Sequence, residues 1–491
     1  MKKLWLLITI ILTVFTVSAC NMPNEREDVP RDEVISYLNI YYVNDLHGAI
    51  LPSYRSIGMA SIGNLLVSQK EAAPEQTLIL AGGDMLQGGA LSNITYGEAV
   101  IELMNATYFD AFALGNHEFD WGLDKVMRYF DPSSAYYTAE FSMLGANVID
   151  IRTETTPDFV EPYTIVERGQ LTIGIIGAMG YGLESSIHPQ HIENYRFDPP
   201  VPIVESYARY LRNEKDADVV LLLTHDPGET RNFQNLNEGV AAFDEDAKVD
   251  VVFNAHSHQV FTKNIDGLAA IQSGGYGSHV GLVQLSLDDT TVTNITMSNL
   301  DKTNEPLLNV PHPRIQSIVD RFVLETDDYL NTPIITAGEP LQRDALSLWL
   351  STLMLETTNA DIALQNRGGT RSDIPGGTEI TMSVLYDVWP FDNTVKTGYL
   401  RGDVIESFLH NVGWSTYVTT IEPFEADTYY KVATNDFVFD QPHYPFVNAI
   451  DIEDTNIELL ALVEAELKRQ AKHYDLFYLD NPLILDKENT D

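Results

Sequence analysis

Five short apolar runs in the first half of the chain each end in residues that can bind a metal ion or move a proton. The chemical groups at these ends, in chain order, are Asp45 with His47, Asp84, Asn116 with His117, His225, and His256 with His258. The runs predict buried strands, and segments with helical spacing separate them, so we expect a mostly parallel sheet. Because ligands bind at the carboxyl edge of such sheets, the function depends on whether these five ends converge.

The seven candidate ligands at these ends carry oxygen or imidazole donors and no thiolate. That donor set suits Zn, Mn, Fe or Co in a catalytic site better than structural zinc, which favours cysteine. Asp45-x-His47 and His256-x-His258 would each place two alternate side chains of an extended segment on one face. An isolated Asp-x-His is more often a turn. Seven ligands exceed what one ion takes while keeping an open position, so two ions sharing Asp84 fit the count.

Taken in order, these strand ends resemble the motif series of the calcineurin-like metallophosphoesterases. The residues that carry the resemblance are Asp45-x-His47, Gly82-Gly83-Asp84, Gly115-Asn116-His117-Glu118, Thr224-His225-Asp226 and His256-Ser257-His258. Their order and spacing are similar to those of the 5′-nucleotidase family, and the resemblance covers about residues 36–480. It implies an α/β fold, with an N-terminal metallophosphoesterase α/β/β/α sandwich domain and a C-terminal α/β substrate domain of the 5′-nucleotidase type.

The resemblance also implies roles for the site residues. One ion would be held by Asp45, His47, Asp84 and His258, and the other by Asp84, Asn116, His225 and His256. Such ion pairs clamp the attacking and leaving oxygens of an in-line displacement. His117 would lie outside the metal shell and stabilise or protonate the reacting group, and Asp120 would orient its imidazole. A helix-capping role for Asp120 stays open, and Glu118 has no assigned role.

Residues of the second half resemble the nucleotide-binding segments of the same family. Arg343, Asn366 and Arg371 would bind the phosphate or the nucleoside, and Phe391 would stack on the base. A surface salt bridge is the alternative for Arg343, and a core position for Phe391. The family's second stacking loop is glycine-rich, whereas this chain has Val438 to Tyr444 (VFDQPHY). Tyr444 aligns as the second ring, but a proline-bearing loop is stiffer and will not place it identically.

The expected organisation has six parts. They are a lipoprotein signal peptide (1–20), a tether (21–35), the catalytic domain (36–310), a linker helix (311–331), the substrate domain (332–480) and an acidic tail (481–491). Within the catalytic domain, the runs at 269–273 and 279–287 are expected to pair as closing strands around a glycine turn.

The first 20 residues predict export and lipid attachment. Lys2 and Lys3 precede an apolar stretch that is short for a membrane span and ends at Cys20, the single cysteine of the chain. We therefore expect an extracytoplasmic protein anchored to the bacterial membrane through lipidated Cys20, with an ordinary signal peptide as the alternative. The formal net charge of −41 argues against nucleic acid as a partner and requires local cations for an anionic substrate. The oligomeric state stays open.

These features predict a dimetal hydrolase that releases nucleoside and phosphate from extracellular nucleotides. Two alternatives remain within the family, a 2′,3′-cyclic nucleotide phosphodiesterase and a UDP-sugar pyrophosphatase, because the loop at 438–444 departs from the family pattern. A non-catalytic substrate-binding lipoprotein is the alternative from another class. The seven ligand-type residues argue against it, because a binding protein has no need of an open dimetal site.

Overall fold

The computed structural model of the chain describes residues 34–228, 236–411 and 415–485. The predicted signal peptide, Cys20 and most of the tether lie outside these residues, as does the end of the predicted acidic tail. Within the described residues, no helix is long and apolar enough to cross a membrane.

Two sheets pack face to face in the N-terminal half of the described chain. The first has the order β15 (Thr291–Leu300), β14 (Val280–Asp288), β1 (Tyr37–Val43), β2 (Thr77–Ala81), β3 (Ala111–Ala113), β4 (Ser142–Leu144) and β6 (Val160–Glu161). The second has the order β12 (Val260–Ile265), β13 (Leu268–Ser273), β11 (Val251–Phe253), β10 (Val219–His225), β8 (Leu171–Met179) and β7 (Tyr163–Arg168). The strands from β1 to β4 are parallel, as are β8, β10, β11 and β13, so the ligand-bearing strand ends of each sheet share one edge.

The core between the two sheets is built from alternate side chains of both. It includes Leu38, Ile40 and Tyr42 of β1 and Val219, Leu221 and Leu223 of β10. The intervening residues of each strand face away from this core. In β10 these are Val220 and Leu222, which pack in a separate cluster with residues of α5. Strands buried on both faces read as continuous apolar runs. That double burial explains why these strands were recognisable in the sequence.

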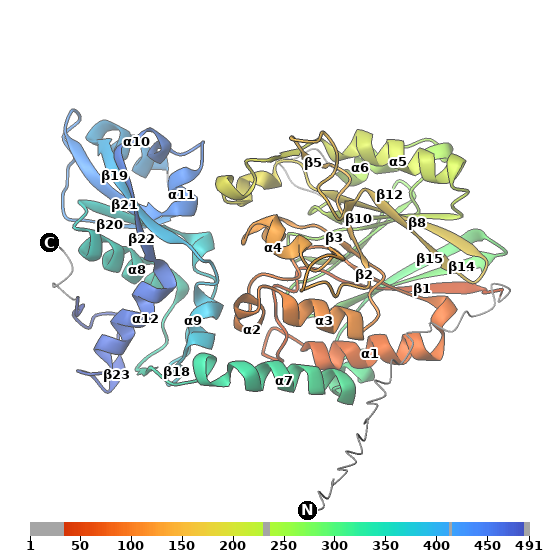
Figure 1. Ribbon diagram of the computed structural model, residues 1–491, viewed down its shortest axis with the longest axis horizontal. Coiled ribbons are helices and arrows are strands. Elements are labelled where there is room, and N and C mark those ends of the chain that lie inside the picture. The colour runs from red at the N-terminus through yellow and green to blue at the C-terminus, as the bar shows by residue number, and fades with distance from the viewer. Residues whose placement is uncertain (1–33, 229–235, 412–414, 486–491) are drawn as a thin grey trace, which may run out of the picture.

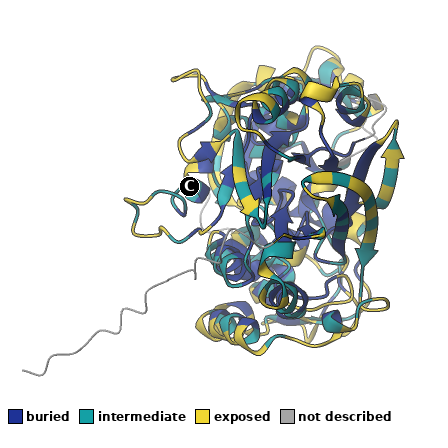
Figure 2. Cartoon of the chain, turned by 90° about the vertical axis from the view of Figure 1, so that its right-hand side faces the viewer, coloured by how far each residue is buried: buried dark blue, intermediate teal, exposed yellow. Residues whose placement is uncertain are grey.

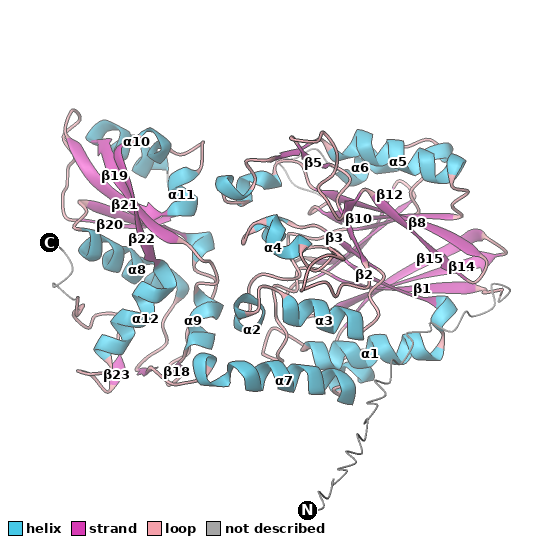
Figure 3. Cartoon of the chain, in the orientation of Figure 1, coloured by secondary structure: helices cyan, strands magenta, loops and turns pink. Residues whose placement is uncertain are grey.

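Helices cover the outer faces and complete the four layers (Figure 1). Those on the side of the first sheet are α1 (Met59–Ala72), α2 (Ala90–Ile94), α3 (Glu98–Ala106) and α4 (Leu123–Met127), and those on the side of the second are α5 (Pro200–Glu214) and α6 (Leu236–Ala241). A short two-stranded ribbon is formed by β5 (Val148–Asp150) and β9 (Tyr195–Phe197), and β5 is seen at the level of α5 and α6 in Figure 3. Figure 2 shows that the central strands are buried, whereas exposed residues lie on the outer sides of the helices, on loops and on edge strands. The α/β/β/α fold class is therefore confirmed.

One strand prediction is wrong. The segments 269–273 and 279–287 do form strands, β13 and β14, but they do not pair with each other. β13 joins β11 and β12 in the second sheet, whereas β14 joins β1 and β15 in the first. The glycine-rich link between them therefore crosses from one sheet to the other.

The long helix α7 (Pro313–Leu330) runs along the edge of the sandwich and leads into the C-terminal domain (Figure 1). It buries Ile315, Val319 and Phe322 against the helical layer that contains α1 and α3. Its amphipathic spacing and Pro313 in the first turn follow the usual rules for a helix start.

The C-terminal domain is a second α/β unit. Its main sheet has the order β20 (Ser415–Thr419), β17 (Ile362–Asn366), β21 (Tyr429–Asn435), β19 (Thr394–Arg401) and β22 (Ile450–Glu458). A smaller sheet contains β18 (Glu379–Ile380), β16 (Ile335–Ala337) and β23 (Leu476–Phe477). The helices are α8 (Arg343–Thr358), α9 (Met382–Val388), α10 (Gly402–Asn411), α11 (Asp436–Asp440) and α12 (Leu459–Gln470).

Candidate active site

All seven candidate metal ligands lie together at the carboxyl edges of both sheets. The first sheet contributes Asp45, His47, Asp84 and Asn116, and the second contributes His225, His256 and His258. The donor atoms form three overlapping groups, and within each group they lie within 4.8 Å of one another: Asp45, His47 and His258; His47, Asp84 and His117; and Asp84, His225 and His256. The five strand ends therefore converge.

Asp84 lies at the centre of this cluster. Its Oδ2 is 3.1 Å from His225 Nε2 and 3.9 Å from His47 Nε2. One carboxylate therefore reaches both halves of the cluster, the half with Asp45, His47 and His258 and the half with Asn116, His225 and His256. On the first half, His47 Nε2 and His258 Nε2 are 3.0 Å apart, and Asp45 Oδ1 is 3.5 Å from His258 Nε2. On the other, His256 Nδ1 is 3.0 Å from Asn116 Oδ1. This geometry fits two ions that share Asp84.

The pKa values of three ligands, the partly exposed His256 and His258 and the buried Asp45, also favour metal binding. Burial lowers the pKa of His256 to about 3 and that of His258 to about 4, so both imidazoles are neutral near pH 7. Neutral imidazole is the form that binds a metal ion. Burial raises the pKa of Asp45 to about 7, which marks a carboxylate that needs a nearby cation to stay ionised.

The backbone at the cluster is strained. The residues with left-handed φ are Asp45 (50°), His47 (48°), Asp84 (50°), His256 (72°) and His258 (54°). Such conformations cost of order 1–3 kcal/mol each for residues other than glycine and concentrate at functional sites. Asp45 and His47 thus converge through a turn that follows β1. The expectation of an extended segment with alternate side chains is wrong for both Asp-x-His and His-x-His.

Glu118 organises the loop that carries Asp84. Its buried carboxylate accepts four backbone N–H groups, from Asp84 at 2.9 Å, Met85 at 2.9 Å, Leu86 at 3.3 Å and Gly115 at 2.8 Å. Burial and the neighbouring Asp84 carboxylate raise the pKa of Glu118 to about 7, and these N–H groups oppose the rise. The sequence left Glu118 without a role. Its partners are backbone groups, most of them more than 30 residues earlier in the chain, and no side-chain pattern reveals them.

Gly83 allows the Asp84 loop to approach the second sheet. Its φ is +88°, and a Cβ at this position would lie 2.7 Å from His225 Nδ1 and 2.8 Å from the backbone nitrogen of Gly115. The positive φ and the close approach of these atoms both require glycine. The Gly82-Gly83 pair of the sequence is thus a packing requirement of the site.

His117 lies beside the cluster and makes the contacts of an acid–base group. Its Nδ1 is 2.6 Å from Asp120 Oδ2, and its Nε2 is 3.1 Å from Arg371 Nη2 of the C-terminal domain. Burial disfavours the imidazolium, but the Asp120 and Asp84 carboxylates outweigh burial and raise the pKa of His117. Its backbone N–H donates to Asp84 Oδ1 at 2.8 Å, which ties the imidazole to the centre of the cluster.

A pocket of about 490 Å³ opens from His117 between the two domains. Asn116, His117 and His256 form its inner end, and Asn366, Arg371 and Phe391 line it from the C-terminal domain. We call this space the main pocket. The Phe391 ring lies 5.9 Å from that of His117 and nearly parallel to it, at 26°. Three of the predicted substrate residues are therefore brought to the cluster.

The other two predicted substrate residues lie elsewhere. Arg343 lines a separate open cavity with Arg55 and Asp373, although Arg371 also borders that cavity. The Tyr444 ring packs 6.1 Å from Phe408, against the hydrophobic core of the C-terminal sheet. The aromatic residue that the chain after β21 places in the main pocket is Phe437, on α11. It was missed because the family comparison directed attention to the loop end at Tyr444, after the proline.

Hydrogen bonds hold the two domains together around the main pocket. Gln87 Nε2 and Asn93 Nδ2 both donate to the carbonyl oxygen of Pro390, at 2.7 and 2.8 Å. At the opposite rim, Gln441 Nε2 donates to the carbonyl oxygen of Ile187 at 3.0 Å. These bonds hold Pro390, and with it the neighbouring Phe391, beside the cluster.

Comparisons with known proteins agree with this architecture. The sequence model of the calcineurin-like phosphoesterases matches residues 38–260, and that of the 5′-nucleotidase C-terminal domain matches residues 333–420. The chain therefore combines a calcineurin-like phosphoesterase domain with a 5′-nucleotidase C-terminal domain, the two domains that its motif series predicted.

Named relatives are distant. The chain is 25% identical over 442 residues to endonuclease YhcR of Bacillus subtilis, an alignment that covers 83% of this chain and 35% of the relative. It is 24% identical over 430 residues to a 5′-nucleotidase of Vibrio parahaemolyticus, covering 76% of this chain and 74% of that protein. The chain thus spans about a third of the length of the first relative and about three quarters of the second.

A solved structure shares the whole fold. It is a 5′-nucleotidase precursor from Thermus thermophilus, with a TM-score of 0.76 and 21% identity, and the match covers 92% of this chain and 98% of that one. The two-domain arrangement thus recurs almost over the full length of both chains.

Proposed function

We propose that this protein hydrolyses nucleoside 5′-monophosphates to nucleoside and inorganic phosphate. The observation that carries the proposal is the position of His117, which contacts Asp120, Arg371 and the cluster around Asp84 at once. We further propose that the protein acts outside the cytoplasm and is held at the membrane by lipidated Cys20, as the N-terminal residues indicate.

Two divalent ions, Zn, Mn, Fe or Co, complete the proposed site. We assign one to Asp45, His47, Asp84 and His258 and the other to Asp84, Asn116, His225 and His256. When bound, such ions activate water and neutralise charge on the reacting phosphate. The donor set fits them, because it contains carboxylate, amide and imidazole groups and no thiolate.

The protein's own residues orient the phosphate and handle the proton. Asp120 accepts the hydrogen bond from His117 Nδ1, so Nε2 faces the main pocket. A phosphate oxygen in the main pocket that contacts both His117 Nε2 and Arg371 Nη2 would accept from both, and His117 would then donate its Nε2 proton to the leaving oxygen. The Arg371 guanidinium also supplies a positive charge where the −41 chain would otherwise repel the substrate.

Phe391 is the proposed base-stacking residue. We expect Phe391→Ala to lower kcat/KM for AMP roughly 5- to 150-fold, mainly through KM, since stacking on an aromatic ring contributes about 1–3 kcal/mol. Initial rates over a range of AMP concentrations provide the measurement. Phe408→Ala is a matched control, because Phe408 packs on Tyr444 and Phe446 and not in the main pocket. An unchanged KM in Phe391→Ala would contradict the stacking role.

A second candidate function concerns other phosphoesters of the same family. The position of Tyr444 favours it, because Tyr444 packs against Phe408 and not in the main pocket. Among the described residues of the C-terminal domain, the aromatic rings that line the main pocket are those of Phe391 and Phe437, so the pair of rings differs from the pair that the family resemblance implies. Turnover of AMP, 2′,3′-cyclic AMP and UDP-glucose, each at saturating concentration, separates the candidates. Our proposal expects AMP to be the best substrate, and negligible AMP hydrolysis beside rapid turnover of another ester would overturn it.

A further inference from the structure

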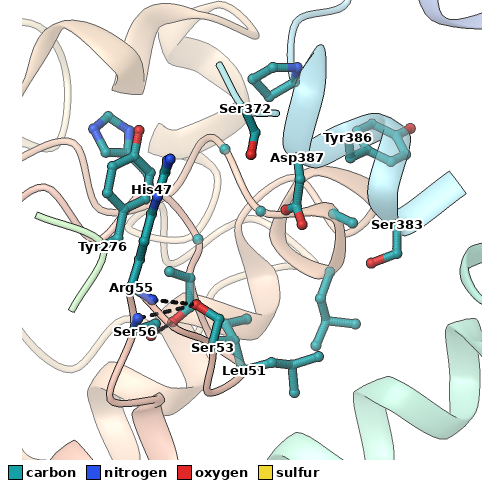
Figure 4. A pocket seen from close by; sticks show the side chains of 18 of the residues that line it. His47, Leu51, Ser53, Arg55, Ser56, Tyr276, Ser372, Ser383, Tyr386 and Asp387 are labelled. Atoms are coloured by element: carbon teal, nitrogen blue, oxygen red, sulfur yellow. Dashed lines mark hydrogen bonds between the residues drawn. The ribbon is translucent and has the colours of Figure 1, made fainter. Parts of the chain in front are cut away.

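A second cavity adjoins the candidate metal cluster from the side of His47. It has a volume of about 330 Å³, and we call it the side cavity (Figure 4). Its inner end is formed by His47, Gln87, Tyr276 and Arg371, and two of these, Gln87 and Arg371, also line the main pocket. The two spaces therefore meet beside the cluster, one at His47 and the other at Asn116 and His117.

The position of the side cavity relates it to the nucleophile. In an in-line displacement, the attacking oxygen enters opposite the leaving oxygen. His117, the proposed donor to the leaving oxygen, lines the main pocket, whereas His47, whose ring centre lies 5.0 Å from that of His117, lines the side cavity. A group that attacks from the side opposite His117 would therefore reach the phosphate past His47, from the side cavity.

The side cavity is larger than a water nucleophile needs. One water occupies roughly 30 Å³ in the liquid, and pockets for small organic molecules begin at roughly 300 Å³. Its walls come from both domains and from α7, and Leu51, Leu91 and Val323 supply apolar surface. An organic molecule fits a mixed lining of this kind better than a single ion or a water.

Hydroxyl and carboxylate groups gather on two walls of the side cavity. The loop after β1 contributes Ser53 and Arg55, while Ser372, Ser383 and Asp387 face them from the C-terminal domain (Figure 4). Asp387 is exposed to solvent, and partial loss of hydration beside the cavity raises its pKa to about 6, an effect that Arg55 opposes. Serine hydroxyls beside a carboxylate are the groups that bind the hydroxyls of a polyol or sugar.

We propose that the side cavity binds a hydroxyl-bearing acceptor, such as a polyol or sugar, and that the protein transfers the phosphoryl group from a nucleotide to this acceptor in competition with water. The inference rests on the proposed function. The acceptor oxygen forms a new bond to phosphorus, and the bond from phosphorus to the nucleoside oxygen breaks. The acceptor hydroxyl loses its proton to solvent, the leaving oxygen takes one from His117, and His117 regains a proton from solvent. Atoms and charges balance without a further reactant.

Product ratios test the proposal on the purified full chain with its metals. AMP is incubated without acceptor and with glycerol or glucose, and adenosine and inorganic phosphate are measured separately. Hydrolysis alone gives equal amounts, whereas transfer gives adenosine in excess by the amount of phosphorylated acceptor. We expect the ratio of adenosine to phosphate to rise above 1 with at least one of the two acceptors, and the phosphorylated acceptor to appear in the mixture.

Variants of the side cavity provide the decisive comparison. Asp387→Ala and Ser383→Trp, which fills the cavity, should each lower the excess of adenosine at least fivefold. Asp328→Ala is the matched control, since it removes an exposed carboxylate from α7 outside the cavity lining and should keep both the excess and the AMP turnover.

Three outcomes would overturn the inference or its basis, and they are distinguishable. A ratio of 1 with both acceptors, at normal AMP turnover, would refute transfer and leave the proposed function intact. An excess that survives both side-cavity variants would show that acceptors enter from bulk solvent. Absence of any adenosine release from AMP would refute the proposed function itself.

Discussion

Replacing His117 with alanine is expected to lower kcat for AMP hydrolysis at least 100-fold, with a much smaller change in KM. The imidazole is buried between Asp120 and the Asp84 carboxylate, and its Nε2 faces the space where the phosphate would lie. General acid–base groups contribute roughly 10²–10⁴ to the rate, so the loss of this one accounts for a fall of that size. Steady-state kinetics of the variant at saturating AMP measures the effect.

Two further variants make the His117 result specific. Asp120→Asn keeps the size of the side chain and removes its charge, so it should lower kcat by a smaller factor than His117→Ala does. His410→Ala removes an exposed imidazole on α10, far from the cluster in sequence and fold, and should leave kcat unchanged. Turnover that is unchanged in His117→Ala would contradict the assigned role.

Glu118→Ala is expected to lower the free energy of unfolding by about 4 kcal/mol and to empty the metal site. The substitution leaves the N–H groups of Asp84, Met85, Leu86 and Gly115 without their acceptor in a buried place. Each unsatisfied buried donor costs roughly 1–3 kcal/mol, reduced where water or local rearrangement replaces the lost acceptor. Because Asp84 is carried on the same loop, its carboxylate would no longer be held at the centre of the cluster.

Urea unfolding and metal analysis of the same preparations measure both effects of Glu118→Ala. Glu118→Gln, which keeps one acceptor oxygen, should lie between the wild type and the alanine variant. Glu140→Ala is a matched control on an exposed side chain, and it should change stability by no more than about 0.5 kcal/mol. A Glu118→Ala protein of near wild-type stability with full metal content would show that the loop holds its shape without this carboxylate.

Much of the catalytic domain was predictable because its strands are buried on both faces. The apolar runs at 77–81, 171–178 and 217–223 form β2, β8 and β10, and the bounds of run and strand agree to within two residues. That β13 and β14 join different sheets was not predictable, since the local alternation of apolar and polar residues does not specify which sheet a strand joins. The division into two sheets came from the family resemblance, and the core residues Leu38 and Leu221 then explain it.

The candidate site was predictable where side chains carry the pattern and not where the backbone does. The seven ligand-type residues and His117 stood out by type and spacing, and the structure brings them together. The left-handed turns at Asp45 and His258 could not be read from the sequence, because their strain is maintained by contacts between loops. Glu118 was missed because its partners are backbone groups, and Phe437 was missed because the family resemblance pointed to Tyr444.

The most direct test of the account combines metal analysis with AMP turnover on one preparation of the purified full chain. Metal content is measured by mass spectrometry before and after chelation, and again after each candidate ion is restored. The account predicts about two ions per chain as isolated, loss of AMP hydrolysis on chelation and recovery with at least one of Zn, Mn, Fe or Co. Protein that carries no stoichiometric metal and binds AMP without turning it over would contradict the account and favour a binding lipoprotein.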